Sequence, residues 1–148
     1  MSKLFAQRER QIADVILPVP TRMRFSYLVP ERYEGVLQAG MRVIVPFGKR
    51  KLQTGVIAEL WTSADERELG KLKLLDELLD DEPVVPPRLL ALWAWIADYY
   101  FCSEGEAMQA SLPTGLKLQS ELTVTLEGEP DLMREDLSDQ EYLVLEAV

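Results

Sequence analysis

Hydrophobic residues in the first sixty positions fall into short runs that proline, glycine and polar residues separate. Short apolar runs that end at turn-forming residues are typical of β-strands. Pro18 and Pro30 close the first two runs, because proline donates no hydrogen bond to a neighbouring strand. Four or five short strands at this spacing predict a small antiparallel β-barrel or sandwich. The runs cover residues 13–17, 25–29, 41–47 and 51–60.

Two details inside these runs predict how the strands pack. Side chains alternate along a strand, so Arg42 and Ile44 are expected to face away from Val43 and Val45. Gly55 lies inside the fourth run. A glycine there usually marks a bulge or the close approach of another backbone.

The apolar spacing becomes helical after Pro86 and Pro87, which suit the first turn of a helix. Trp93 and Trp95 point to different sides of this predicted helix, so either one is exposed or both are partly buried. A second short helix is predicted over 105–110. The apolar positions of the first helix are Leu89, Leu92, Trp93, Ile96, Tyr99 and Tyr100.

The segments before and after these helices are less regular. Residues 62–70 form a polar, acid-rich connection, and residues 72–79 fit a strand that runs into a turn at 80–81. Residues 116–126 alternate like a further strand. Ser138 and Glu141 have the spacing of a capping box, which predicts a last helix. That helix would continue to the final residue without a capping glycine, so we expect the chain to be part of a longer protein.

Composition narrows the class of protein. The chain has 148 residues, of which 47% are hydrophobic, and it has no apolar run of 18 residues, so no transmembrane helix is predicted. The first dozen residues lack the apolar segment and cleavage site of a secretion signal. Cys102 is the only cysteine and cannot form an internal disulfide. We therefore expect a cytoplasmic protein.

The net charge of −9 by itself argues against nucleic-acid binding, because two polyanions repel each other. The charge is, however, unevenly distributed between the two halves of the chain. Residues 1–75 hold 13 basic and 8 acidic residues, whereas residues 76–148 hold 3 basic and 17 acidic residues. The first half is therefore a mildly basic module and the second half is strongly acidic.

Catalytic chemistry finds little support in the sequence. The chain has no histidine, and it contains no nucleophile elbow, Walker A loop or dinucleotide fingerprint. The acidic residues 76–82 lack the spacing of a calcium loop and are interpreted as a solvated turn. Cys102 has no basic neighbour in sequence and is interpreted as a structural thiol. We predict no enzyme active site, no metal and no cofactor in this chain.

Aromatic, glycine and basic residues in the first half are the candidates for binding. Phe25 and Tyr27 share one face of a predicted strand, where they either stack on bases or fill the core. The segment 47–51 combines an aromatic ring, Gly48 and the cations Lys49, Arg50 and Lys51. It fits either a phosphate-binding loop or a solvated hairpin tip. Lys73 by itself is interpreted as an exposed strand lysine.

An ordered series of motifs resembles the N-terminal part of the PriA family of primosomal replication-restart helicases. Each motif is weakly specific, but together they follow one another from about residue 13 to residue 113. They are L-P-V-P at 17–20, F-S-Y at 25–27, G-x-R-V-x-V-P-F-G-K at 40–49, G-V-I at 55–57, L-K-L-L-D-E-L-L-D-D-E-P at 72–83, W-I-A-D-Y-Y-F-C at 95–102 and G-E-A-M-Q-A-S-L-P at 105–113.

The resemblance implies a mainly β domain with helices over 1–115, which binds the 3′ end of DNA, and the start of a winged-helix domain over 116–148. In the family this first domain holds the 3′-terminal nucleotide of the nascent leading strand at a stalled fork. The corresponding pocket residues here would be Phe25, Ser26, Gly48 and Lys73. Many members carry aspartate where this chain has Ser26, and serine is a weaker partner for a base edge.

The resemblance also implies a parent protein and its partners. The parent would be a nucleoid-associated, ATP-dependent 3′→5′ helicase whose ATP, Mg and Zn sites lie in a region absent from this sequence. Single-strand DNA-binding protein and other primosome proteins would be further partners. The alternative is a protein-interaction module, in which the acidic second half and the helix with Trp93 and Trp95 bind a basic partner surface.

Overall fold

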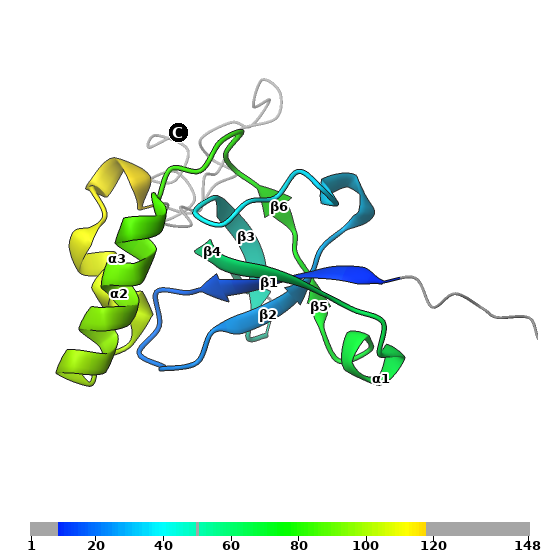
Figure 1. Cartoon of the computed structure of the whole chain (residues 1–148), viewed down its shortest axis with the longest axis horizontal. Helices are drawn as coiled ribbons and strands as arrows, with labels where there is room; N and C mark the ends of the chain where they lie inside the picture. The colour runs from blue at the N-terminus through cyan, green and yellow to red at the C-terminus, as the bar shows by residue number, and fades with distance from the viewer. Residues whose placement is uncertain (1–8, 50, 118–148) are drawn as a thin grey trace, which may run out of the picture.

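The computed structural model describes residues 9–49 and 51–117 as one curled sheet with helices at its side (Figure 1). The strand order is β5-β2-β1-β4-β3-β6. The strands are β1 Arg10–Ile16, β2 Phe25–Leu28, β3 Arg42–Phe47, β4 Lys51–Ser63, β5 Lys73–Leu74 and β6 Glu77–Leu78. The helices are α1 Glu66–Leu69, α2 Pro87–Tyr100 and α3 Glu104–Ser111, with the 3-10 turns η1 Glu31–Tyr33 and η2 Thr114–Leu116.

The expected mainly β architecture with helices is confirmed. All four long apolar runs form strands, and both predicted helices occur as α2 and α3. Two details differ from the prediction. The β2–β5 pair is parallel, whereas the other pairs are antiparallel, and the connection 62–70 contains the short helix α1. The Asp65 carboxylate caps α1 by accepting a hydrogen bond from the Arg67 N–H.

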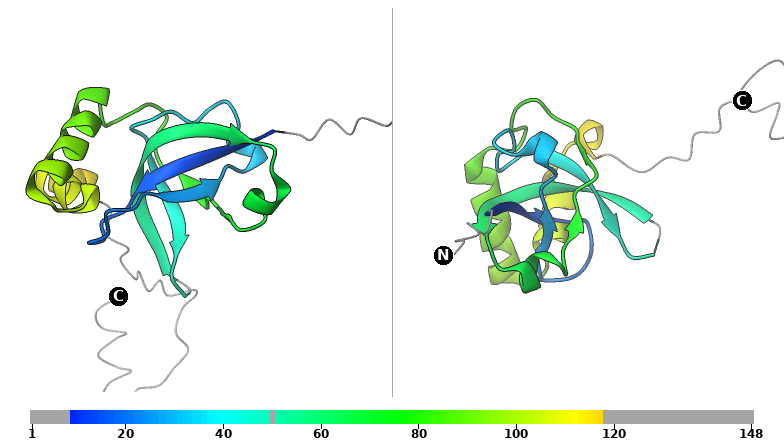
Figure 2. Two further views of the ribbon diagram at one scale, coloured as in Figure 1. Left: turned by 60° about the horizontal axis from the view of Figure 1, so that its bottom comes forward. Right: turned by 90° about the vertical axis from the view of Figure 1, so that its right-hand side faces the viewer.

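The segment predicted as one strand over 72–79 is split between the two edges of the sheet. Its first part, β5, pairs with β2, and its second part, β6, pairs with β3. The switch occurs between neighbours, because the Leu75 N–H donates to the Leu28 C=O and the Asp76 N–H donates to the Ile44 C=O. The sheet therefore curls until its edges nearly meet, as the turned views show (Figure 2).

Two clusters of apolar side chains form on opposite faces of the curled sheet. Val43 and Val45 point into the inner cluster with Tyr27 and Ile57, which confirms the alternation expected for β3. Ile16 and Val56 belong to the outer cluster, where α2 and α3 pack through Trp93 and Met108. The helices α2 and α3 lie together on one side of the sheet, and the short helix α1 lies away from them (Figures 1 and 2).

The close approach expected at Gly55 is confirmed. A Cβ atom at this position would overlap the Val15 side chain and lie 2.7 Å from the Ile16 carbonyl oxygen. The neighbouring strand β1 also changes register between Asp14 and Val15. The glycine therefore lets β1 and β4 cross closely where the sheet bends.

The predicted winged-helix domain over 116–148 lies almost entirely outside the described residues, as do most of the strand expected over 116–126 and the helix expected from Ser138. Of that region the structure describes Leu116, which ends η2, and Lys117. Among the described helices, none combines the length and the apolar character needed to cross a membrane.

Candidate nucleic-acid interface

Aromatic rings meet at one end of the curled sheet. Phe25 begins β2 and Phe47 ends β3, and their ring centroids lie 5.2 Å apart in an edge-to-face arrangement. Both rings are half-buried against the inner cluster. Tyr27 is buried, and its hydroxyl donates to the Pro46 C=O at 3.1 Å. Burial raises the pKa of Tyr27, so the neutral phenol remains a core residue, whereas the Phe25 side chain is only partly buried.

Gly48 follows Phe47 directly and turns the chain toward β4. Its φ of 68° lies in the left-handed region, which favours glycine. A Cβ atom there would meet no other atom within 4 Å, so lack of space does not explain the glycine. Its backbone conformation does, and the position is open to solvent or to a ligand. Lys49 and Lys51 are exposed beside it, and Arg50 lies outside the described residues.

Lys73 reaches this loop from a distant part of the chain. It begins β5 in register with Tyr27, and its Nζ donates to the Gly48 C=O at 3.4 Å. Lys73 is exposed, so its ammonium group remains accessible from solvent. The fold therefore brings the backbone of Gly48, the ring of Phe25 and the charge of Lys73 to one end of the curled sheet.

Ser26 has a different orientation from its neighbour Phe25. Its side chain lies on the opposite face of β2, where Ser26 Oγ donates to Asp14 Oδ1 at 2.6 Å. The Val29 N–H donates to the Gln11 C=O, so these two residues form a hydrogen-bonded pair of the antiparallel ladder. Hydrogen-bonded and non-hydrogen-bonded pairs alternate along such a ladder, and the pair of Asp14 and Ser26 is three positions further along, so its backbone groups do not bond to each other. The Ser26 N–H and C=O therefore point away from β1, toward the edge where Lys73 begins β5. The backbone of Ser26 faces the candidate site, although its hydroxyl does not.

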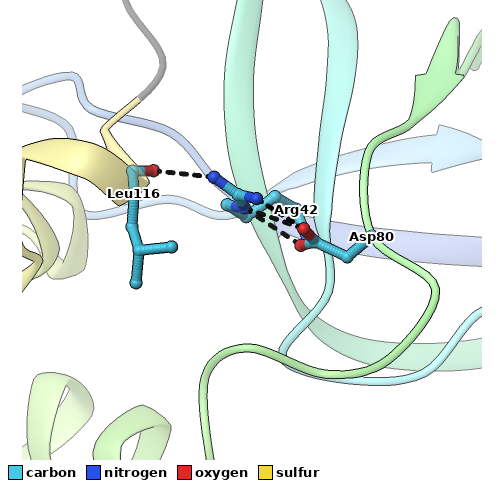
Figure 3. A network of polar contacts seen from close by, with 3 residues as sticks. All are labelled: Arg42, Asp80 and Leu116. Atoms are coloured by element: carbon cyan, nitrogen blue, oxygen red, sulfur yellow. Dashed lines mark hydrogen bonds and ion pairs between the residues drawn. The ribbon is translucent and has the colours of Figure 1, made fainter.

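A second polar cluster lies on the outer face of β3 (Figure 3). Arg42 Nε donates to the Asp80 carboxylate at 3.0 Å and 3.1 Å, and the Arg42 N–H donates to it at 2.8 Å. Arg42 Nη1 also donates to the Leu116 C=O at 3.3 Å. The prediction of a solvated acidic turn over 76–82 is therefore wrong for Asp80, which is buried because Arg42 compensates its charge.

A groove of about 790 Å³ opens beside this cluster, between β4, α3 and η2. Arg42, Lys51 and Lys117 line it together with leucine and methionine side chains, and none of the described residues that line it carries a carboxylate. Sequence reasoning did not anticipate this groove, because its walls come from several segments that lie far apart in the sequence.

The exposed side of α2 carries an aromatic surface, formed by Trp95, Tyr99, Tyr100 and Phe101. Trp95 is 56% exposed whereas Trp93 is fully buried, so the two tryptophans do lie on different sides of the helix. The Trp95 and Tyr99 rings stack with centroids 5.1 Å apart. Phe101 ends the helix in the left-handed conformation and is 81% exposed, with Arg22 over its ring.

Comparison with known proteins identifies the family. A family model described as "3'DNA-binding domain (3'BD)" of PriA matches residues 14–113. The chain is 36% identical over 123 residues to the replication restart protein PriA of Bacillus subtilis, covering 81% of this chain and 15% of that protein. It is 36% identical over 107 residues to PriA of Haemophilus influenzae, covering 72% of this chain and 14% of that protein. The sequence thus spans about one seventh of these relatives, and it belongs to the PriA 3′DNA-binding domain family.

Proposed function

We propose that this chain binds the 3′-terminal nucleotide of a DNA strand at the end of the curled sheet where Phe25, Gly48 and Lys73 converge. The observation that carries the proposal is the contact between Lys73 Nζ and the Gly48 C=O, which joins two segments 25 residues apart beside Phe25. Family membership supports DNA as the ligand. The backbone of Ser26, which faces the same edge, completes the proposed pocket.

Each group has a distinct role in this proposal. The Lys73 ammonium group neutralises the phosphate that precedes the terminal nucleotide, and the Phe25 edge packs against its sugar. Gly48 lets the backbone approach the 3′-hydroxyl, since it carries no side chain. A phosphate on that hydroxyl would have to displace these close contacts. The pocket would therefore recognise a free 3′ end without recognising base sequence.

The relatives that contain this domain are named replication restart proteins. We propose that the parent of this chain is an ATP-dependent 3′→5′ helicase, and that this domain directs it to the nascent leading strand at stalled forks. The few basic groups near the pocket favour weak binding, micromolar or poorer, when the domain acts alone.

The test is fluorescence anisotropy with single-stranded oligonucleotides that differ only in a 3′-hydroxyl or a 3′-phosphate. The intact chain is expected to bind the free 3′-hydroxyl better. Lys73→Ala and Phe25→Ala are each expected to weaken this binding by about tenfold, which corresponds to the loss of one charge-assisted hydrogen bond or one ring contact.

Lys71→Ala is the matched control, because Lys71 is also exposed and lies two residues before Lys73. It is expected to change the affinity by less than about twofold, since it removes a charge without removing the pocket contact. Equal binding of 3′-hydroxyl and 3′-phosphate oligonucleotides by the intact chain would refute the proposal.

The aromatic surface of α2 favours a second candidate function, the docking of a partner protein. Contiguous exposed aromatic residues are typical of protein interfaces. Residues 76–117 hold eight acidic and two basic residues, so the surroundings favour a partner with a basic surface. Single-strand DNA-binding protein and other primosome proteins are the partners that the family suggests.

Trp95→Ala combined with Tyr99→Ala is expected to abolish capture of such a partner in a pull-down without DNA. The reason is that these two rings form the stacked centre of the surface. Phe25→Ala is the control and should leave capture unchanged, because Phe25 lies at the other site. Unchanged capture by the double variant would exclude α2 as the docking surface.

A further inference from the structure

The first part of β4 has one free edge. β1 pairs with β4 only as far as Val56, which lies in register with Ile16, the last residue of β1. Beyond that point β3 and β4 project from the rest of the sheet as a two-stranded hairpin (Figure 2). A Cβ atom at Gly105 would overlap the Leu17 carbonyl group, so α3 lies directly against the chain where it leaves β4. Among the described strands, none covers this edge of residues 51–55.

Two residues of this edge turn their backbone polar groups outward. The Ile44 C=O accepts a hydrogen bond from the Asp76 N–H, so the backbone groups of Ile44 point away from β4. Ile44 lies opposite Thr54, and hydrogen-bonded and non-hydrogen-bonded pairs alternate, so neither Thr54 nor Leu52 bonds to β3. Their N–H and C=O groups therefore point to the free edge. Among the described residues no hydrogen bond uses these groups, and such a row is a template for a further strand.

The groove between β4, α3 and η2 runs along this free edge. Its other walls include the apolar side chains of Met108, Leu112 and Leu116. Its volume of about 790 Å³ lies within the range of about 300–1,000 Å³ that is usual for ligand-binding clefts. A strand that paired with Leu52 and Thr54 would take the place in the sheet that β1 leaves. Its side chains on one face would then pack against these apolar residues.

The charge of the groove determines the kind of partner. Lys51 and Lys117 line it and are exposed, and neither forms an ion pair with a described residue. Arg42 is already paired with Asp80, so the two lysines supply the uncompensated charge. None of the described residues that line the groove carries a carboxylate, although the whole chain has a net charge of −9. An acidic segment is therefore attracted to this groove and repelled by much of the remaining surface.

We propose that this groove binds an extended acidic segment of a partner protein, which adds a strand to the free edge of β4. Main-chain hydrogen bonds to Leu52 and Thr54 align the segment, and Lys51 and Lys117 select its carboxylates. The surface on α2 has acidic surroundings, so the two surfaces select partners of opposite charge. This proposal does not depend on the proposed binding of a DNA end.

The backbone groups of the edge favour a peptide over a DNA strand in this groove. Leu52 and Thr54 each present a donor and an acceptor, which a second strand matches group by group. The phosphates of DNA only accept hydrogen bonds, so they would meet the two carbonyl oxygens without a donor between them. The leucine and methionine side chains of the groove also offer no aromatic ring on which a base would stack.

The test uses a fluorescently labelled octapeptide in which valine and glutamate alternate, with both ends blocked. Fluorescence anisotropy measures its affinity for the intact chain, and we expect saturable binding. The same peptide with lysine in place of glutamate is expected to bind about tenfold more weakly, because its charges are repelled by the lysines of the groove.

Thr54→Pro tests the strand pairing. The proline removes the N–H that faces the groove, and it leaves the hydrogen bonds between β3 and β4 in place, since Thr54 makes none of them. We expect it to weaken peptide binding by about tenfold, through the loss of a main-chain hydrogen bond and of close strand approach. Thr54→Val is the matched control, because it keeps the backbone N–H and the size of the side chain, and it should change the affinity by less than about twofold. Far-UV circular dichroism verifies that both variants are folded.

Lys117→Gln tests the charge of the groove without altering a strand. It is expected to weaken binding of the glutamate peptide by about threefold, as is usual for the loss of an exposed ion pair. Lys71→Gln is its matched control, because Lys71 is exposed and does not line the groove. It should leave the affinity unchanged.

Four results would overturn the proposal. The first is the absence of saturable binding of the glutamate peptide, and the second is equal binding of the glutamate and lysine peptides. The third is displacement of the peptide by a 3′-hydroxyl oligonucleotide, which would assign the groove to DNA. The fourth is a concentration-dependent dimer of the intact chain, measured by sedimentation, that Thr54→Pro abolishes, because a second copy would then occupy the edge.

Discussion

Trp93→Ala is expected to lower the free energy of unfolding by about 3–5 kcal/mol, the usual cost of removing a buried tryptophan side chain. Trp93 is fully buried in the outer cluster, where α2 meets α3 and the sheet. Its Nε1 donates to Ser111 Oγ at 2.6 Å, which ties α2 to the end of α3. The substitution leaves a cavity at the junction of three elements and also removes this hydrogen bond.

Guanidinium unfolding followed by far-UV circular dichroism measures this change. Trp95→Ala is the control, because Trp95 is the same residue type two positions away and is largely exposed. It is expected to change the free energy of unfolding by less than about 0.5 kcal/mol. A comparable loss of stability in the two variants would contradict the burial of Trp93 on the sheet side of α2.

Asp80→Ala is expected to destabilise the domain by a similar amount, about 3–5 kcal/mol, because it leaves the Arg42 guanidinium buried without a counterion. Both side chains are largely buried, and the pair also carries the hydrogen bond to the Leu116 C=O. Asp81→Ala, next in sequence and exposed, is the control and should have little effect. The double variant Arg42→Ala with Asp80→Ala is expected to cost less than the sum of the single variants, since the two groups act as a pair.

The pH dependence of stability offers a second measurement of the same pair. Burial by itself raises the pKa of Asp80, but hydrogen bonds from the Arg42 side chain and backbone and the charge of Arg42 outweigh it. The pKa of Asp80 in the folded chain therefore lies below its ordinary value of 3.8. The contribution of Asp80 is complete above that value and is lost as the pH falls from it toward the folded pKa. As the pH falls from 3.8 toward the folded pKa, the free energy of unfolding of the intact chain should therefore decrease by more than that of the Asp80→Ala variant.

Local patterns were sufficient to predict most of the secondary structure. The strands β1 to β4 and the helices α2 and α3 were predictable because alternation, helical spacing and proline positions act within a few residues. The same patterns predicted the close packing at Gly55 and the opposite orientations of Trp93 and Trp95. They failed for residues 72–79, where a single apolar stretch is divided between two edges of one sheet.

The candidate site divides in the same way. The sequence by itself determined which residue types are available to bind a DNA end: an aromatic residue on a strand, a loop with glycine, and a lysine. It also contains the motifs by which the chain resembles the family. Only the tertiary structure decided that Lys73 lies at Gly48, that Arg42 is paired with Asp80 and that Ser26 donates to Asp14. These contacts join residues 12 to 38 positions apart. They depend on strand register and on the closure of the sheet, which no short stretch of sequence specifies.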